Sequence, residues 1–316
     1  MCLVFQQPAS FIEADRQILS ESYDVVPFVY HGKRDLVSLI RAIRQCDIAY
    51  SWFALGHATA AVMISRWLGR RSVVVTGGWD VAAMPEIAYG AMISQSRRRK
   101  TVRTLRRADL VLAVSEANRR EAAQWVSRDI RVVHLGVDPG FFRPGGLKQD
   151  EVATVAAIGD EWGITKKGLD VFLDVARMMP DVAFTVVGVS AGVERTLRSK
   201  ASANVTFTGL LDRGAVRTVY QRSRVYVQLS AHESFGLAVA EAMACACTPV
   251  VSDRGSLPEV VGTAGVVVPY GDSTAAARAI RDALRMDGGR ARSRLVETFP
   301  LSRRRDQLLA LLERLT

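Results

Sequence analysis

The stretch Ser230-Ala-His-Glu-Ser-Phe-Gly-Leu-Ala-Val-Ala-Glu-Ala-Met-Ala244 follows the apolar run 225–229. This pattern predicts a strand, a turn that holds Glu233, and a helix that begins at Gly236. The free N–H groups and the positive dipole end of such a helix favour a phosphate or diphosphate, and a glycine there lets the phosphate come close. Glu241, on the second turn, is placed to accept hydrogen bonds from a vicinal diol such as ribose. The spacing alone fits a second interpretation equally well, in which Glu233 caps the helix and Glu241 lies at the surface without binding a ligand.

Short β-branched runs alternate with helical stretches along the whole chain of 316 residues. The expected strands cover 25–29, 47–51, 72–76, 109–114 and 130–133 in a first set, and 152–158, 182–187, 205–207, 225–229, 249–252 and 266–268 in a second set. The expected helices lie near 33–45, 56–69, 90–107, 116–126, 167–178, 213–221, 236–245, 273–286 and 302–315. This rhythm is typical of parallel sheets that are covered on both faces.

A segment rich in Gly and Pro, Gly136–Gly146, separates the two sets of strands and has the composition of a linker. We therefore expect an α/β protein of two Rossmann-like, doubly wound domains, which fits this break better than one (β/α)8 barrel. The expected domains are 1–145 and 146–300. The last helix, within 301–316, follows the final strand of the second sheet. We expect it to pack back toward the first domain or across the linker.

The composition is that of an ordinary globular enzyme. The chain carries 42 Lys and Arg against 32 Asp and Glu, a formal net charge of +10, with 49% hydrophobic residues. It has neither a run of about 20 apolar residues nor a signal-peptide pattern at its start, so we expect a cytoplasmic protein. The four cysteines, Cys2, Cys46, Cys245 and Cys247, lack the spacing of a zinc site. We expect buried thiols in a reducing compartment and no metal site.

The densest basic run lies at 97–107, where no acid occurs between the cations Arg97, Arg98, Arg99, Lys100, Arg103, Arg106 and Arg107. One interpretation is a solvated helix face. Another is a surface for anionic lipid head groups, since each basic side chain near such a membrane contributes about 1 kcal/mol; the protein would then be peripheral on the inner face of the membrane. Nucleic acid is disfavoured, because no aromatic platform, helix-turn-helix or zinc pattern accompanies the charge.

Other motifs accompany the opening stretch in a fixed order. They are Val114-Ser115, Gly136-Val-Asp138 with Phe142-x-Pro144, Lys167-Gly-Leu-Asp170, Val205-Thr-Phe-Thr-Gly209, Glu233-x-Phe-Gly-Leu-x-x-x-Glu241-Ala-Met-Ala, Pro249-Val-Val and Leu257-Pro-Glu-Val-Val-Gly262. Together they span about residues 109–270 and resemble the signature of the retaining glycosyltransferases of family 4. Several ordered motifs at family spacing are a specific signal, unlike a lone glycine-rich turn. The resemblance implies the GT-B architecture, in which two Rossmann-like domains face a cleft, with the acceptor on the side of the first domain (1–145) and the nucleotide sugar bound by the second (146–300).

The resemblance also implies roles for single residues. Glu241 would bind the nucleotide ribose, Glu233 would lie beside the donor sugar, and Lys167 would place a cation on the diphosphate. Lysine and a helix terminus would replace a metal as the phosphate clamp, and no cofactor is expected besides the UDP- or GDP-linked sugar donor. The turn Gly209–Leu210 would help form the base pocket. The implied donor-binding set is Lys166, Gly209, Leu210, Phe235, Gly236, Leu237 and Glu241.

The chain departs from the family pattern just before the Lys-Gly element. Family members usually carry Gly-Arg there, with the Arg on the diphosphate, whereas Gly159–Lys167 is longer and has no Arg. Lys166 is the candidate for the second cation. The first domain has Gln6–Ser10 where the family has a glycine-rich loop. These departures leave open the identity of the donor sugar and the geometry around the diphosphate.

Two residues of the first domain follow expected strands, at the ends where ligands bind in open α/β sheets. His57 begins a helix after Ser51-Trp52, and Asp80 ends the turn Thr76-Gly-Gly-Trp-Asp80. Asp80 is placed to touch a hydroxyl of the donor sugar or acceptor, and we count both residues as candidate catalytic groups with Glu233 and Lys167. The alternatives are an ordinary histidine at a helix start and an Asp80 that caps a helix.

The expected activity is transfer of a sugar from a nucleoside-diphosphate donor to an acceptor hydroxyl, with retention at the anomeric carbon. The resemblance implies front-face attack, in which the departing diphosphate takes the acceptor proton, so no protein nucleophile is assigned. The basic first domain favours a lipid-linked or cell-envelope glycan as acceptor. The alternative is a catalytically silent nucleotide-binding protein that docks a membrane or partner. Turnover of a nucleotide sugar distinguishes the two.

Overall fold

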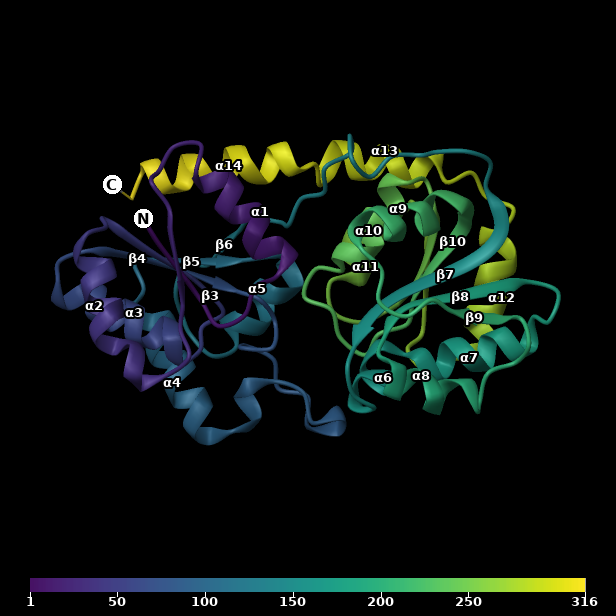
Figure 1. The fold of residues 1–316 in the computed structure, drawn as a ribbon, viewed down its shortest axis with the longest axis horizontal. Helices are drawn as coiled ribbons and strands as arrows, with labels where there is room; N and C mark the ends of the chain where they lie inside the picture. Colours follow the sequence, from purple (N-terminus) through teal and green to yellow (C-terminus); the bar gives the residue numbers. More distant parts are fainter. Residues whose placement is uncertain (316) are drawn as a thin grey trace. The chain divides into compact units, whose positions relative to one another are not determined.

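The structure, a computed structural model, describes residues 1–315 and divides into two compact units (Figure 1). The first unit is Met1–Leu135 together with the chain from Ser302 onward, and the second is Gly136–Leu301. Each unit is built on a six-stranded sheet whose strands are all parallel. The expected α/β class with two Rossmann-like sheets is confirmed.

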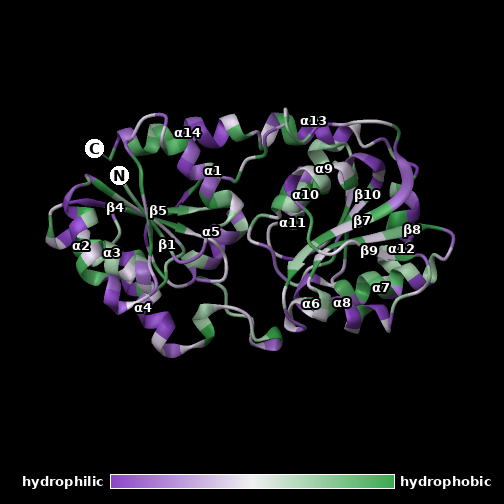
Figure 2. Cartoon of the chain, in the orientation of Figure 1, coloured by the Kyte–Doolittle hydropathy of each residue, from purple (hydrophilic) through white to green (hydrophobic). Residues whose placement is uncertain are grey.

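The first sheet has the strand order β2-β1-β3-β4-β5-β6. Its strands are β1 (Cys2–Phe5), β2 (Val26–Val29), β3 (Ile48–Trp52), β4 (Arg71–Thr76), β5 (Leu110–Ala113) and β6 (Arg131–Val132). The helices of this unit are α1 (Ser10–Leu19), α2 (Leu36–Arg44), α3 (Gly56–Trp67), α4 (Gln95–Arg107), α5 (Glu116–Ala123) and α14 (Leu301–Glu313). The central strands β3 and β4 are buried along almost their whole length, as expected where helices cover both faces, and the strands are mostly hydrophobic in Figure 2.

The second sheet has the order β12-β11-β10-β7-β8-β9. Its strands are β7 (Gln149–Ile158), β8 (Ala183–Val189), β9 (Val205–Phe207), β10 (Ser223–Gln228), β11 (Thr248–Ser252) and β12 (Val266–Val268). Its helices are α6 (Trp162–Lys167), α7 (Leu169–Met178), α8 (Ala191–Arg198), α9 (Arg213–Arg222), α10 (Leu237–Ala244), α11 (Leu257–Val261), α12 (Ser273–Ala283) and α13 (Gly289–Thr298). No helix within residues 1–315 has both the length and the apolar character needed to cross a bilayer.

Each sheet contains one point at which the strand order reverses. In the first sheet the reversal falls between β1 and β3, and in the second between β7 and β10. Loops that leave two neighbouring strands at such a point turn to opposite faces of the sheet, so they open a crevice at the carboxyl ends of the strands where ligands bind. The residues that follow β1, β3, β7 and β10 are therefore the first place to look for a site.

The sequence did not predict β1, α1, α6, α8, α11 and α13. β1 is a run of four residues buried on both faces, so it lacks the alternation by which a strand is recognised. α13 follows two glycines and is rich in polar residues, a composition that reads as a loop. Its arginines bind backbone carbonyls instead: Arg294 donates to Glu259 and Val260 at 2.7 and 2.8 Å.

The segment rich in Gly and Pro, Gly136–Gly146, lies in the second unit and is packed against it. Val137 forms a β-bridge with Pro300. The ring of Phe142 is fully buried, 6.1 Å from the ring of Tyr220. The chain passes from one unit to the other between Leu135 and Gly136, and returns between Leu301 and Ser302.

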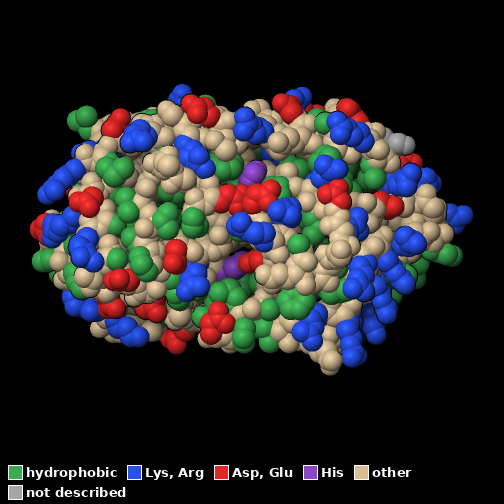
Figure 3. Space-filling view, turned by 180° about the vertical axis from the view of Figure 1, so that it is seen from behind, with side chains coloured by type: hydrophobic (Ala, Val, Ile, Leu, Met, Phe, Trp, Pro, Cys, Tyr) green, Lys and Arg blue, Asp and Glu red, His purple; other side chains and the backbone are tan. Residues whose placement is uncertain are grey.

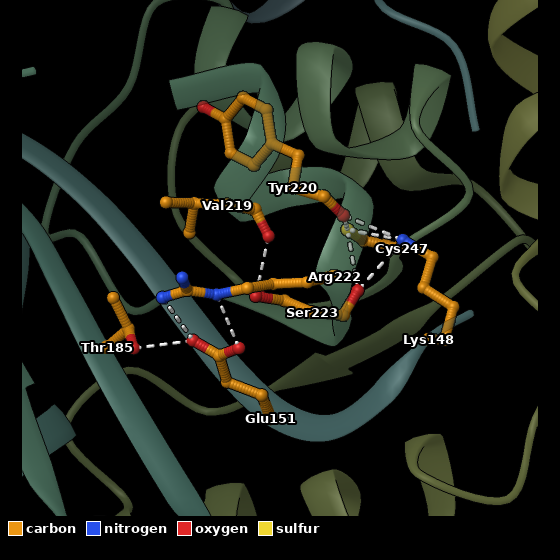
Figure 4. Close-up of polar contacts among 8 residues, drawn as sticks. All are labelled: Lys148, Glu151, Thr185, Val219, Tyr220, Arg222, Ser223 and Cys247. Atoms are coloured by element: carbon orange, nitrogen blue, oxygen red, sulfur yellow. Dashed lines mark hydrogen bonds and ion pairs between the residues drawn. The ribbon is translucent and has the colours of Figure 1, made fainter. Parts of the chain in front are cut away.

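A cluster of polar contacts links the start of β7 to α9 (Figure 4). The Arg222 guanidinium donates to both carboxylate oxygens of Glu151 at 2.8 and 3.1 Å, and the Thr185 hydroxyl donates to the same carboxylate at 2.5 Å. The Lys148 ammonium donates to the carbonyls of Tyr220 and Ser223 at 2.7 and 2.8 Å, near the end of α9. A cation at a helix C-terminus binds carbonyls that have no partner within the helix.

The terminal helix α14 is anchored in the first unit by a buried ion pair. Arg304 donates to both oxygens of Asp15 on α1 at 2.6 and 2.8 Å, and the two side chains are 2% and 0% exposed. Asp15 also accepts from the Tyr50 hydroxyl at 2.8 Å and from the Trp52 indole at 3.0 Å. The prediction that this helix packs back toward the first domain is confirmed.

Replacement of Arg304 by alanine should destabilise the first unit strongly, because it leaves the Asp15 carboxylate buried without its cation. We expect the free energy of unfolding to fall by about 3–5 kcal/mol. Arg305→Ala is the matched control on the same helix, since Arg305 pairs with Glu21 at the exposed surface and its loss should have a far smaller effect. Urea denaturation of both variants measures the difference, and equal losses would contradict an anchoring role for Arg304.

Candidate active site

An ion pair lies at the reversal point of the second sheet. Lys167 ends α6 after β7, Glu233 follows β10, and the Lys167 Nζ lies 2.6 Å from Glu233 Oε1. The same oxygen accepts from the Ser230 hydroxyl at 3.0 Å and from the Gln228 amide at 3.1 Å. The structure thus brings together two residues that are 66 positions apart and that the sequence assigned to one site.

The Lys-Gly element is explained by backbone packing. The sequence predicts one helix from 167, but α6 ends at Lys167 and α7 begins at Leu169. Gly168 between them has φ +65°, and a Cβ there would lie 2.1 Å from the carbonyl oxygen of Leu229. Only glycine allows this approach, which holds Lys167 against the end of β10. The Ala231 N–H adds a hydrogen bond to the Lys166 carbonyl at 2.9 Å.

The charges of this cluster compensate one another. Burial alone would raise the pKa of Glu233, but the charge of Lys167 and its hydrogen bond, with Lys166 nearby, hold that pKa below its ordinary value. Burial, together with the neighbouring Lys167, lowers the pKa of Lys166. Lys166 also lies over the ring of Trp162, 5.7 Å from its centroid. A second ammonium group therefore lies beside the Lys167–Glu233 pair.

The helix that follows this pair begins as the sequence predicts. Gly236 precedes α10 with φ +89°, and Leu237 is its first residue. The Glu233 carbonyl accepts from the Ser256 N–H at 2.9 Å and from its hydroxyl at 3.1 Å, which fixes the turn. Phe235 is buried, with its ring 5.5 Å from the ring of Phe299. Its side chain therefore belongs to the core and only its backbone is available to a ligand.

Glu241 on α10 is the least satisfied carboxylate of the site. Its side chain is half-buried, and the Tyr220 hydroxyl donates to it at 3.4 Å. Burial raises the pKa of Glu241 to about 7, although Arg213 and Tyr220 act in the opposite direction. Burial raises the pKa of Tyr226, and the charges of Glu233 and Glu241 raise it further, so both carboxylates lie near this buried phenol.

The turn predicted to form the base pocket has an exposed apolar residue. Gly209 has φ +66°, and its carbonyl accepts from the Gly188 N–H at 2.8 Å, at the end of β8. Leu210, the next residue, is 75% exposed. The turn therefore presents a large apolar side chain to solvent beside a strand end.

The structure gives the two candidates of the first unit different surroundings. Asp80 is fully buried, and its carboxylate accepts from the backbone N–H groups of Ala54, Gly77 and Gly78 at 2.7, 3.0 and 2.9 Å. Burial raises its pKa to about 6, against the effect of these hydrogen bonds. Asp80 thus holds together the loop after β3 and the loop after β4. The other candidate, His57, binds the backbone through its ring: its Nε2 lies 2.6 Å from the carbonyl oxygen of Trp52.

Several residues of the site were not identified from the sequence. Tyr226, Gln228 and Ser230 alternate along β10 and its extension, so they project from the same face of the sheet. The Tyr226 hydroxyl donates to Gln228 at 2.7 Å, and the Gln228 amide donates to Ser230 at 2.6 Å. Polar residues at every second position of an otherwise apolar buried strand were the available signal. Arg213 and Tyr220 lie on α9 near Glu241, and no sequence pattern marks them as residues of the site.

Metal binding has no support from clustered ligands in the part of the chain that the structure describes. Residues 1–315 contain no group of three or more His, Cys, Asp or Glu side chains that could hold an ion. The cysteines Cys2, Cys46, Cys245 and Cys247 are buried as free thiols. The groups that could hold an anion are the ammonium groups of Lys166 and Lys167 and the start of α10.

Two family models match the chain, one in each unit. The model "Glycosyltransferase Family 4" matches residues 6–141, and the model "Glycosyl transferases group 1" matches residues 163–298. Together they account for most of the chain, and both describe glycosyltransferases.

Curated relatives are similar over part of their length. A lipopolysaccharide core biosynthesis mannosyltransferase of Rhizobium leguminosarum bv. viciae is 31% identical over 209 residues, which are 59% of this chain and 58% of the relative. A D-inositol 3-phosphate glycosyltransferase of Mycobacterium bovis is 32% identical over 208 residues, 57% of this chain and 43% of the relative. The match thus spans about half the length of these relatives.

Solved structures share the whole fold. HepE (Alr3699) from Anabaena, in complex with UDP and glucose, has a TM-score of 0.83 at 17% identity, over 99% of this chain and 98% of that one. A sucrose-phosphate synthase from Thermosynechococcus elongatus has a TM-score of 0.81 at 17% identity, over the same fractions. Likeness at this level of identity establishes the fold.

The ion pair makes a prediction that needs no substrate. In Lys167→Met the buried Glu233 loses its cation, so its pKa should rise from below its ordinary value to above it, by about one to three pH units. Carbon-13 NMR titration of the glutamate carboxyl groups measures this pKa, with Glu233→Gln to assign the signal. Lys200→Met, at an exposed position of the same unit, is the control and should leave the titration unchanged. An unaltered Glu233 titration in Lys167→Met would contradict the coupling.

Proposed function

The chain belongs to the glycosyltransferases of GT-B architecture that resemble family 4, and on this premise we propose that it transfers a sugar from a nucleoside-diphosphate sugar to an acceptor hydroxyl. The proposal includes retention at the anomeric carbon, a UDP- or GDP-linked donor and no metal ion. In this proposal the acceptor hydroxyl is part of a lipid-linked or cell-envelope glycan.

The arrangement of charges at the reversal point of the second sheet carries this proposal. Two lysines, a helix start and two carboxylates converge there, where open α/β sheets bind ligands. We assign the diphosphate to Lys167, Lys166 and the N–H groups at Gly236–Leu237, which supply positive charge without a metal. Glu241 accepts the ribose hydroxyls. Its raised pKa and single weak hydrogen bond support a carboxylate that gains partners when a ligand binds.

The reaction needs charge stabilisation more than a protein nucleophile. The bond between the anomeric carbon and the diphosphate oxygen breaks, the acceptor oxygen forms its bond on the same face, and the acceptor proton passes to the departing diphosphate. Lys167 stabilises the negative charge that grows on this leaving group. Glu233, held by Lys167, Ser230 and Gln228, accepts hydrogen bonds from the donor sugar.

A second candidate function is docking to an anionic membrane surface through α4. Most of its basic side chains are exposed, while Thr101, Thr104 and Leu105 are buried, and Figure 3 shows basic side chains gathered over this helix at the lower right. On the neighbouring α3, Trp67 is 73% exposed, and Met63, one turn before it, accepts from Arg107 at 3.1 Å. An exposed tryptophan beside clustered cations is typical of membrane interfaces.

Nucleotide binding tests the main proposal. Calorimetric titration with UDP and GDP, with and without EDTA, should show binding of one of them that chelation does not change. Glu241→Ala should weaken this binding at least tenfold. Because the pKa of Glu241 is raised to about 7, the carboxylate is mostly protonated at pH 6 and mostly ionised at pH 8. Affinity should therefore rise about tenfold between these values.

The ionisation of the nucleotide phosphate also contributes to this pH dependence, so Glu241→Gln is needed as a reference. This variant should keep only the contribution of the nucleotide, while the exposed Glu297→Gln should behave as the unsubstituted protein. Binding of neither nucleotide, or binding without release of sugar from any UDP- or GDP-linked donor, would favour the catalytically silent alternative.

Membrane docking makes a separate prediction. Reversal of three exposed charges, Arg99→Glu, Arg103→Glu and Arg106→Glu, should reduce binding to vesicles of 30% phosphatidylglycerol at least tenfold, since each basic side chain contributes about 1 kcal/mol. Binding of the unsubstituted protein should fall as salt screens the charges. The control is Arg34→Glu, Arg41→Glu and Arg44→Glu, with the same net charge on exposed positions of α2 and of the turn just before it. If both triple variants bind alike, α4 is a solvated face.

A further inference from the structure

The first unit contains a cavity of about 640 Å³ at its own reversal point. Its walls come from Ile12 on α1 and from the residues that follow four strands: Gln6 and Gln7 after β1, Tyr30 and His31 after β2, Phe53, Leu55 and His57 after β3, and Trp79 after β4. The reversal in this sheet falls between β1 and β3, so the cavity is where an open parallel sheet places a ligand. The donor groups described above all belong to the second unit, and none of them lines this cavity.

The walls are aromatic and polar, with two imidazoles, those of His31 and His57. Among the described residues that line the cavity there is no Asp, Glu, Lys or Arg. A buried carboxylate, that of Asp80, binds the backbone of Ala54, which is next in sequence to the lining residues Phe53 and Leu55, and of Gly77, which lies against the Phe53 ring. A carboxylate behind the wall and a lining without lysine or arginine disfavour a phosphate or carboxylate ligand, because such groups need a cation when they leave water. Arg97 stacks on Trp79 but does not line the cavity.

One polar atom in the wall lacks a partner. His57 is 1% exposed, and its Nε2 lies 2.6 Å from the Trp52 carbonyl, which can only accept a hydrogen bond. The proton of the neutral ring is therefore on Nε2, and Nδ1 is left as an acceptor. Burial lowers the pKa of His57, which favours this neutral form at pH 7. The buried Nδ1 has no hydrogen-bond partner, a state that is uncommon without a functional reason. A ligand hydroxyl would satisfy it.

A strained backbone position lies in the same wall. Phe53 has φ +66°, a conformation that costs about 1–3 kcal/mol for such a residue and that is found mainly at functional sites. Its ring occupies the space of a side chain at Gly77, where a Cβ would lie 2.1 Å from the ring. The ring of Phe11 holds it at 6.1 Å in an edge-on arrangement. The fold thus keeps a strained residue in order to hold this ring at the cavity.

We propose that this cavity binds an uncharged sugar residue of the acceptor, with one hydroxyl donating to His57 Nδ1 and the C–H face of the ring packed against Phe53 and Trp79. Aromatic walls combined with a few neutral hydrogen-bonding groups are suited to a pyranose, which has an apolar face and a hydroxylated rim. The inference rests on the proposed transferase activity and names its acceptor class: a neutral glycan, as opposed to a phosphorylated sugar or polyol.

Saturation-transfer NMR with the full chain and saturating UDP or GDP tests the site. The probes are the methyl α-glycosides of mannose, glucose and galactose, each at millimolar concentration, and mannose 6-phosphate as the charged comparison. At least one neutral glycoside should bind, and mannose 6-phosphate should bind more weakly. His57→Phe and Trp79→Ala should each raise the dissociation constant of that glycoside roughly tenfold while leaving nucleotide affinity unchanged. Trp125→Phe, which alters a tryptophan of the same unit outside the cavity, should change neither.

The nucleotide affinity separates failure of this inference from failure of the proposed function. Intact nucleotide binding with no glycoside bound, or tighter binding of mannose 6-phosphate, would overturn the acceptor class alone. A donor sugar is the other source of the same chemistry. If His57→Phe weakens binding of the nucleotide sugar relative to the free nucleotide and leaves the glycosides unaffected, the cavity belongs to the donor and the inference is wrong. Trp79 is half-buried, so its variant keeps the test valid should His57→Phe fold poorly.

Discussion

The single reversal of strand order in each parallel sheet is the constraint on which the candidate sites depend. A parallel strand must be followed by a crossover, and where successive crossovers change direction the loops at the carboxyl ends separate. In the second sheet this happens between β7 and β10, and the Lys167–Glu233 pair lies there. In the first sheet it happens between β1 and β3, where the cavity lined by Phe53 and His57 lies. Topology fixes the places, and the side chains decide the chemistry.

The buried carboxylates differ in how fully they are satisfied, and the difference separates structural roles from binding roles. Asp15 receives the guanidinium of Arg304 and two further donors, and Asp80 receives three backbone N–H groups, so neither has much capacity left for a ligand. Glu241 has one long hydrogen bond and a raised pKa. Since an unpaired buried charge is costly, the weak pairing of this carboxylate on α10 supports the proposal that it gains a partner when a ligand binds.

The sequence predicted the features that depend on neighbouring residues and missed those that depend on distant ones. The alternation of strands and helices predicted both sheets, and the strand-turn-helix around Glu233 predicted the start of α10. By contrast, Arg304 and Asp15 are 289 positions apart, and nothing local marks them as partners. Asp80 after a strand fits a ligand contact and a loop-positioning role equally well, until its three N–H donors are located. The positive φ of Phe53 has no sequence signal at all, because aromatic residues seldom adopt it.

The Lys167–Glu233 pair also bears on how a diphosphate would enter the second site. In the unliganded chain the cation is already bound to a carboxylate, so a diphosphate must compete for it, and the electrostatic gain is the difference between two pairings. Glu233 would then lose its cation while remaining buried. The free-energy cost of such a buried carboxylate grows with each hydrogen-bond donor that it loses. Ser230 and Gln228 donate to the same oxygen, so Glu233 would keep two neutral donors if Lys167 turned toward a phosphate. In the proposed reaction these donors would limit the cost of sharing the lysine between the carboxylate and the diphosphate.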